Sequence, residues 1–216
     1  MSTITLYGAA GTIGSRVLEE ALRRGHRVTA VVRDPARLTV AHPALTVAAG
    51  DVLDPVSVAE HARGVDVVVS AVGGGDGPGH QALIKASFEA LVAGLRMLGP
   101  DAPRMITVGG AGSLRTPDGK QVWDAEGLPE FVLQIMHAHG DALDYVRTVS
   151  DVKWTNLSPA ATIAPGERTG AYREALEELL IGPDGKSRIS TEDYAVAMVD
   201  EIEWPKHLGE RFTVAY

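Results

Sequence analysis

A glycine-rich turn near the N-terminus constrains the fold of this chain more than any other feature. Gly8–Gly14 has the sequence GAAGTIG and lies between an expected strand, Thr3–Tyr7, and an amphipathic helix. The G-x-x-G-x-x-G spacing supplies one glycine for a tight turn, one for close approach of a ligand and one for helix–strand packing. The helix N-terminus directs unpaired N–H groups and a positive dipole end at that ligand, which favours phosphate. A purely structural turn is the alternative.

Short β-branched runs alternate with segments of helical period along most of the chain. Further strands are expected at Arg27–Val32, Leu45–Ala49, Val65–Val72, Met105–Val108, Lys153–Leu157 and Arg211–Ala215, and helices near Val56–Ala62, Gln81–Leu98, Pro129–Val149 and Thr191–Glu203. Parallel neighbours need right-handed crossovers, which such intervening helices provide. The pattern therefore predicts an α/β fold with a Rossmann-type, doubly wound, mostly parallel sheet.

The periodicity weakens after Pro159. We expect a loop as far as Gly170 and then a helix over Arg173–Leu180. Because neither a linker nor an internal repeat is visible, we expect one domain over residues 1–216, with residues 159–190 forming a small lobe on the substrate side.

Composition excludes several classes of function. The formal net charge is -8 and the cationic residues form no stripe, which disfavours nucleic acid as a partner. The chain has no cysteine, so disulfides and thiolate metal sites are excluded. Neither a signal peptide nor an apolar run of about 20 residues occurs, which predicts a soluble, cytoplasmic protein that does not span a membrane.

The end of the second strand bears on which dinucleotide would bind. Arg33 and Asp34 follow the glycine triplet by about 20 residues, where an acid grips the ribose of NAD and an arginine accommodates the 2′-phosphate of NADP. Because Arg33 comes first, NADP(H) is favoured over NAD(H). The alternative is a solvated Arg33 beside an Asp34 that caps the next turn. Asp51 and Val52 follow the third strand and are expected at the adenine edge.

Two further strand ends are expected to border the crevice. Ser70–Gly73 ends the fourth strand at the switch point, where open α/β sheets bind ligands. The segment Gly73–Gly79 is expected to be a loop, either over the crevice or simply connecting. Gly109–Ser113 follows the fifth strand and is expected to present Ser113 to the nicotinamide end. A capped structural turn is the alternative for Ser113.

The proton-transfer pair of short-chain dehydrogenases, Tyr-x-x-x-Lys, is absent from the chain. The equivalent helix carries His137 and His139 instead. His139 lies at the centre of the apolar face and is a candidate proton donor or substrate anchor, whereas His137 points away. A core histidine without a chemical role is the alternative for His139. Residues two apart on a helix do not face each other, so the pair is a poor metal chelate, and no metal site is expected.

Five segments together carry a resemblance: GAAGTIG, VGGAGSL, KWTNLSPA, PGERTGAYR and ISTEDYAVAMVDEIE. The chain resembles the atypical short-chain dehydrogenase/reductases of the NADH-flavin reductase-like group, related to NmrA-like proteins and biliverdin reductase B. The resemblance implies a Rossmann domain with a small C-terminal lobe, a position for Ser113 near the nicotinamide, and a substrate wall from Pro159–Thr162 and Gly166–Gly170. It implies cofactor contacts at Gly8, Ala10, Gly11, Thr12, Ile13, Gly14, Arg33, Asp51, Val52, Ala71, Val72 and Gly73. The chain departs from the group's pattern in Val132–Asp144, where two histidines and a glycine interrupt the helix.

Hydride transfer from NAD(P)H to a flat, electron-poor acceptor is the function that these features favour. Free flavin, a quinone or a related aromatic would serve, because positioning alone can promote such a transfer. Flavin would be a substrate and not a prosthetic group. One alternative is a non-catalytic NADP(H) sensor of the NmrA-like type, and another is a pathway-specific reductase or isomerase. The identity of the acceptor, the proton donor and the oligomeric state stay open at this point.

Overall fold

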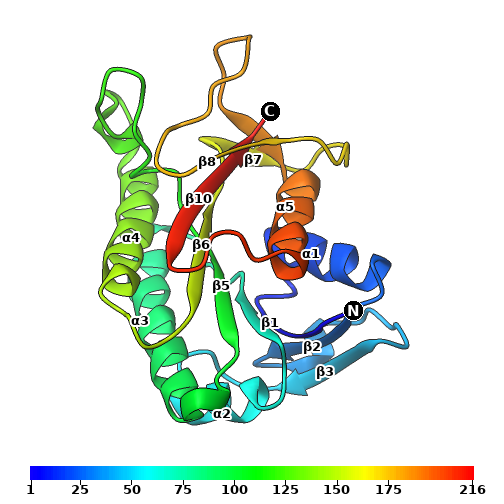
Figure 1. Cartoon of the computed structure of the whole chain (residues 1–216). Helices are drawn as coiled ribbons and strands as arrows, with labels where there is room; N and C mark the ends of the chain where they lie inside the picture. The colour runs from blue at the N-terminus through cyan, green and yellow to red at the C-terminus, as the bar shows by residue number, and fades with distance from the viewer.

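The computed structural model describes residues 1–216 and is built around one eight-stranded sheet (Figure 1). The strand order is β3-β2-β1-β4-β5-β6-β10-β8. The strands are β1 (Thr3–Tyr7), β2 (Arg27–Val32), β3 (Leu45–Ala49), β4 (Val67–Ser70), β5 (Arg104–Val108), β6 (Trp154–Ser158), β8 (Arg173–Ala175) and β10 (Glu210–Ala215). All neighbours pair in parallel except β8, which runs antiparallel to β10. The predicted fold class is therefore confirmed.

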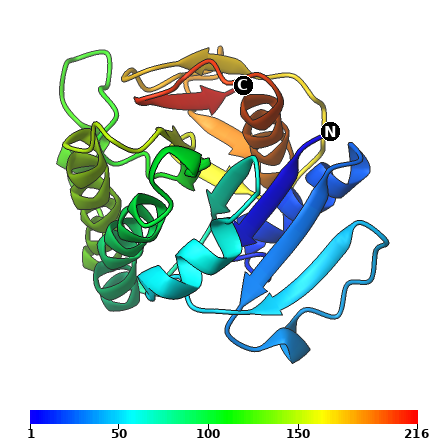
Figure 2. The same ribbon diagram turned by 60° about the horizontal axis from the view of Figure 1, so that its bottom comes forward.

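Helices cover both faces of the sheet (Figure 2). One face carries α1 (Thr12–Arg23) and α5 (Thr191–Glu203), and the other carries α2 (Pro55–Ala62), α3 (Gly77–Arg96) and α4 (Glu130–Arg147). Short 3-10 turns lie at η1 (Pro35–Arg37), η2 (Gly99–Asp101) and η3 (Val122–Asp124). Strand residues alternate between the two cores, so that Val67 and Val69 join the α1/α5 side while Val68 joins the α3/α4 side. None of the helices combines the length and hydropathy that crossing a bilayer requires.

The chain reverses its winding direction at β1. The strands β2 and β3 extend the sheet to one side of β1, whereas β4, β5 and β6 extend it to the other. The connections that leave the carboxyl ends of β1 and β4 therefore diverge, and this divergence opens a crevice at that edge. The glycine turn Gly8–Gly14 lies at this point, directly after β1.

The expected helix over Arg173–Leu180 is wrong. Residues Arg173–Ala175 form strand β8, which pairs with the otherwise free edge of β10. The segment after β8 is held by Arg115, whose backbone N–H donates to the Glu177 carbonyl at 2.8 Å and whose carbonyl accepts from Leu179 N at 2.7 Å. Pairing with distant backbone thus overrides the local helical pattern.

Two segments that we expected to be loops contain regular structure. The strand β7 (Thr162–Ala164) pairs in parallel with β9 (Arg188–Ser190) and forms a second, two-stranded sheet. The segment Gly73–Gly79 is shorter as a loop than expected, because α3 already begins at Gly77. Asp76 caps that helix by accepting a hydrogen bond from Gly79 N at 2.7 Å, and Pro78 suits its first turn.

A buried carboxylate joins the glycine-turn helix to the loop after β7. Glu20 of α1 is 3% exposed and accepts hydrogen bonds from Arg23, Arg24 and Arg168. The Arg168 Nε–Glu20 Oε2 distance is 2.8 Å, which connects residues far apart in the chain. Arg24 also pairs with Asp200 of α5 at 2.6 Å. The network therefore holds α1, α5 and the Arg168 loop together.

Replacing Glu20 with glutamine is expected to lower the free energy of unfolding by about 2 kcal/mol, because the buried side chain would lose its charge-assisted hydrogen bonds from partly exposed arginines. Glu19 is exposed on the same helix, so Glu19→Gln serves as the matched control and should cost under about 0.5 kcal/mol. Urea unfolding at pH 7 measures both values. Equal stability of the two variants would contradict a structural role for the network.

The same carboxylate predicts a dependence of stability on pH. Burial raises the pKa of Glu20, but hydrogen bonds from Arg168, Arg23 and Arg24 outweigh burial and lower it from 4.5 to about 2. A folded-state pKa below the unfolded one stabilises the fold fully above pH 4.5, and that contribution disappears as the pH falls toward 2. The stability difference between the wild type and Glu20→Gln should therefore shrink over this range, as acid unfolding followed by circular dichroism would record.

Candidate functional site

Two adjoining cavities open at the carboxyl ends of the parallel strands. The first, of about 350 Å³, lies at the ends of β1, β2, β3 and β4. The second, of about 520 Å³, lies between the turn after β5, α4 and the segment after β6. Both are lined by Gly11, Ala71, Val72 and Gly73. The glycine turn and the end of β4 therefore form the boundary between the cavities, and we call them the nucleotide cavity and the acceptor cavity below.

The three glycines of the turn are required for different reasons. Gly8 has a φ of +82°, and a Cβ on it would lie 2.4 Å from the Ala71 carbonyl oxygen. A Cβ on Gly14 would lie 2.1 Å from the Gly8 carbonyl oxygen. A Cβ on Gly11 would meet only that same oxygen, at 3.3 Å. The fold itself requires Gly8 and Gly14, whereas the space beside Gly11 belongs to the cavities.

The N-terminus of α1 supplies hydrogen-bond donors beside this space. Its N-cap residue is Gly11, so no side chain caps the first turn. The backbone N–H groups of Thr12, Ile13 and Gly14 therefore lack helical partners. Thr12 and Ile13 line the acceptor cavity next to Gly11, while Gly14 packs behind the turn. A cradle of uncapped amides and a vacant Cβ position suits a pyrophosphate group.

Two arginines border the nucleotide cavity at the end of β2. Arg33 and Arg37 are exposed, and neither takes part in an ion pair or a side-chain hydrogen bond. The side chain of Asp34 accepts a hydrogen bond from Ala36 N at 3.1 Å and caps η1, as the alternative interpretation expected. This capped turn brings Arg37 to the cavity. Sequence reasoning missed Arg37, although the Asp-Pro pair before it indicates such a turn.

The remaining wall of the nucleotide cavity includes Asp51, Val52 and Tyr7. The Asp51 carboxylate accepts from Leu53 N at 2.9 Å, which fixes the turn after β3. The Tyr7 hydroxyl is buried without a hydrogen-bond partner. Burial, reinforced by the negative charges of Asp51 and Asp54, raises the pKa of Tyr7 and keeps the hydroxyl protonated. Sequence reasoning missed Tyr7 as a lining residue, although its position directly before Gly8 puts it at the strand end.

The acceptor cavity is mostly apolar. Its walls come from α4, from the turn after β5 and from the segment after β6, including Val132, Ile135, Met136, Pro159, Ala160 and Ile163. Most of the expected wall Pro159–Thr162 is thus present. The segment Gly166–Gly170 is not part of the lining. It is held instead against α5, because Gly166 N donates to Glu192 at 2.8 Å and Gly170 N donates to Asp193 at 2.7 Å.

The expected position of Ser113 at the nicotinamide end needs correction. Gly109, Gly110 and Ala111 line the acceptor cavity, but the chain has left it by Gly112, which packs against Met136 and Trp123. The Ser113 Oγ accepts a hydrogen bond from Arg211 at 2.8 Å. Arg211 is buried and also pairs with Glu177. Ser113 therefore belongs to a polar cluster with Arg211 and Glu177 and not to the cavity.

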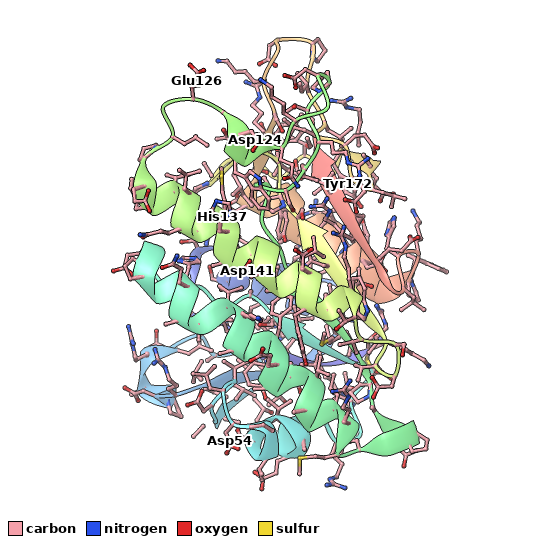
Figure 3. All side chains as sticks on the ribbon, turned by 90° about the vertical axis from the view of Figure 1, so that its left-hand side faces the viewer. Asp54, Asp124, Glu126, His137, Asp141 and Tyr172 are labelled. Atoms are coloured by element: carbon pink, nitrogen blue, oxygen red, sulfur yellow. The ribbon has the colours of Figure 1, made fainter.

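The two histidines of α4 lie on different sides of the helix, as expected. His139 lines the acceptor cavity, and its Nδ1 atom is buried without a partner. Burial, together with the neighbouring His80, lowers the pKa of His139 to about 4, so its imidazole is neutral at pH 7. His137 is exposed on the outer surface of α4, as is Asp141 (Figure 3), and its ring lies against Trp123 with ring centroids 4.7 Å apart and the rings tilted by 32°.

His80 is the lining residue that sequence reasoning missed on this side. It lies in the first turns of α3 and contributes to the acceptor cavity. Its ring centroid is 5.7 Å from that of His139, with the rings tilted by 53°. The sequence signal for it is a histidine directly after the glycine-rich segment Gly73–Gly79.

The contrast between Gly11 and Gly14 gives a test of the site. Gly11→Val is expected to leave the melting temperature within a few degrees of the wild type, because its Cβ would meet only the Gly8 carbonyl oxygen, at 3.3 Å, and to abolish dinucleotide binding. Gly14→Ala is the opposite control, since its Cβ would collide with the Gly8 carbonyl and should destabilise the fold. Calorimetric titration with NADPH and thermal unfolding measure the two effects. Retained binding in Gly11→Val would overturn this assignment of the cavity.

Comparison with known proteins agrees with this geometry. The model of a family described as NAD(P)H-binding matches residues 8–205. The chain is 37% identical over 216 residues to the protein YwnB of Bacillus subtilis, with 98% of this chain and 97% of YwnB covered.

Solved structures show the same similarity. A candidate exported protein of Burkholderia pseudomallei is 43% identical, with a TM-score of 0.88 over 100% of both chains. A candidate NADH-flavin reductase of Streptococcus pneumoniae is 31% identical, with a TM-score of 0.86 over 100% of this chain and 99% of that one. The family match spans most of the chain and includes the glycine turn and both cavities. This protein belongs to the NAD(P)H-binding family.

Proposed function

We propose that this protein is an NADPH-dependent reductase that transfers hydride to a flat, electron-poor small molecule, either a free flavin, a quinone or a related aromatic. The observation that carries the proposal is the junction of the two cavities at Gly11, Ala71, Val72 and Gly73. A dinucleotide with its pyrophosphate at the N-terminus of α1 would reach from one cavity into the other. Hydride transfer then requires mainly that donor and acceptor be held in contact.

Preference for NADPH rests on charge at the end of β2. Arg33 and Arg37 both line the nucleotide cavity, and neither is neutralised by a carboxylate. The one acidic side chain between them, Asp34, is engaged as the cap of η1. Two free guanidinium groups beside an engaged carboxylate suit a 2′-phosphate better than a ribose hydroxyl.

The choice of acceptor rests on the lining of the acceptor cavity. Side chains such as Ile13, Val132, Ile135 and Met136 offer apolar surface to a planar ring, and the few polar groups are backbone amides, Thr12 and two histidines. No Tyr-x-x-x-Lys pair is available to protonate an alkoxide. Similarity to the candidate NADH-flavin reductase of Streptococcus pneumoniae supports a flavin among the acceptors to be tested.

The test is the oxidation of NADPH and NADH by the purified protein, followed at the nicotinamide absorbance with riboflavin, FMN and a series of quinones. Saturable turnover that depends on the protein and prefers NADPH is the expected result. Tight NADPH binding without turnover on any acceptor would overturn the reductase proposal and favour a sensor of dinucleotide state.

Reversing the charge at Arg33 tests the cofactor preference. Arg33→Glu is expected to weaken NADPH binding by about 10- to 100-fold, the loss typical of a charge-assisted contact, and to change NADH binding little. Arg27 lies exposed at the opposite end of the same strand, so Arg27→Glu is the matched control with equal net charge. Fluorescence titration of the wild type and both variants with NADPH and with NADH measures the dissociation constants. An equal loss for both dinucleotides would show that Arg33 does not contact the 2′-phosphate.

A further inference from the structure

Two imidazoles are the only ionisable side chains that line the acceptor cavity. Of its twenty lining residues, only His80 and His139 carry ionisable side chains. The remaining side chains are apolar or absent, apart from the hydroxyl of Thr12. Any proton that protein side chains supply inside this cavity must therefore pass through one of the two histidines.

The hydrogen bond of His80 determines which of its nitrogens is free. Its Nδ1 lies 2.7 Å from the backbone carbonyl oxygen of Asp76. A carbonyl oxygen only accepts, so the Nδ1 atom carries the hydrogen and donates it. The Nε2 atom is therefore the nitrogen that takes up and releases a proton. It lies 3.5 Å from the position that a Cβ on Gly73 would occupy.

The position of Gly73 places the His80 Nε2 atom beside the boundary between the two cavities. Gly73 lines both the nucleotide cavity and the acceptor cavity, so it belongs to the boundary between them. The His80 Nε2 atom therefore faces the boundary at which a dinucleotide in one cavity would meet an acceptor in the other. Gly73 has no side chain, so none of its own atoms stands between its backbone and the His80 Nε2 atom.

The surroundings of His80 contain no fixed counter-charge at Nε2. From α4, the group beside it is His139, whose pKa is lowered to about 4 by burial and by His80 and which stays neutral. Gln134 of α4 is uncharged and packs near Gly77. On the turn before α3, the Asp76 carboxylate is occupied by Gly79 N at 2.7 Å. No ion pair in the structure includes His80.

We infer that His80 is the proton donor of this site, and that the acceptor is a quinone whose ring oxygen receives that proton. The inference rests on the proposed function. NAD(P)H supplies the hydride, with its electron pair, and becomes NAD(P)⁺. The quinone gains this hydride and the proton from His80 Nε2, which together make it a hydroquinone. His80 is left neutral and regains a proton from water.

His139 has a positioning role in this arrangement. Its buried Nδ1 atom has no partner within the protein, and it is the polar atom of α4 that a second quinone oxygen would satisfy. A buried polar atom without a partner is unfavourable until a ligand or water pairs with it. The two histidines thus differ in task, since His80 exchanges the proton while the neutral His139 orients the ring.

The test compares His80→Asn with the wild type. The asparagine amide can still donate to the Asp76 carbonyl and preserve the start of α3, but it cannot release a proton. At pH 6, kcat for quinone reduction is expected to fall about 100-fold, while the dissociation constant for NADPH stays unchanged. The pH profile of kcat should also differ between the wild type and His80→Asn, because the substitution removes the imidazole. His137→Asn, on the outer surface of α4, is the matched control and should behave as the wild type.

A second measurement does not depend on turnover. The ring resonances of His80, assigned by their loss in His80→Asn, are followed by NMR while 1-naphthol, an analogue of the hydroquinone product, is added with NADP⁺. A shift confined to His80 and His139 and absent from His137 is expected. An unchanged His80 resonance during saturable naphthol binding would overturn the inference.

The outcomes separate the two proposals. Quinone turnover that persists with unchanged kcat and pH profile in His80→Asn overturns the role of His80 and leaves the reductase intact. Absence of turnover in the wild type with every acceptor overturns the proposed function, and the assignment of His80 as a proton donor with it.

Discussion

The close backbone contact at the end of β1 is the constraint on which the rest of the structure depends. Gly8 lies so near Ala71, and Gly14 so near Gly8, that neither position has room for a Cβ atom. This contact draws the start of α1 against the end of β4 at the point where the sheet reverses its winding. The uncapped amides of α1 consequently lie at the crevice, and the crevice is divided into two cavities by residues that belong to this same contact. The two cavities are therefore consequences of one packing arrangement.

The segment after β7 is attached to the same helix by charge. Arg168 reaches Glu20 of α1, and Arg16 of α1 reaches Glu192 at the start of α5 with a distance of 2.8 Å. Glu192 in turn accepts from Gly166 N, so the loop after β7 is held to both helices. These residues lie outside the acceptor cavity, and their effect on it is indirect. They fix the segment that follows the cavity wall. The sequence PGERTGAYR therefore has a structural role, whereas the resemblance implied that part of it forms a wall of the substrate site.

Local signals predicted most of the fold, and non-local pairing explains the failures. The bounds of β1, β2, β3 and α5 agree with the sequence patterns, because period and capping residues such as Ser190, which accepts from Asp193 N, are encoded nearby. Arg173–Leu180 has a helical composition, but the free edge of β10 decides its structure. Among the site residues, the glycine turn and the strand ends were predictable from spacing. The positions of Arg37 and His80 could not be predicted in this way, because they are set by the direction of the chain after the turns that Asp34 and Asp76 cap. The position of Ser113 is set by its hydrogen bond with Arg211, which is distant in the sequence.

The absence of a tyrosine–lysine pair restricts the chemistry less than it first suggests. Reduction of a simple ketone leaves an alkoxide, which is strongly basic and requires a donor that is positioned and activated. Reduction of a quinone or flavin spreads the new negative charge over a conjugated ring, so a far weaker demand is made on the donor. An imidazole meets that demand near neutral pH. The apolar lining offers surface to a planar ring, while burial keeps His139 neutral. An apolar cavity with two imidazoles is thus suited to acceptors whose conjugated rings delocalise the new negative charge.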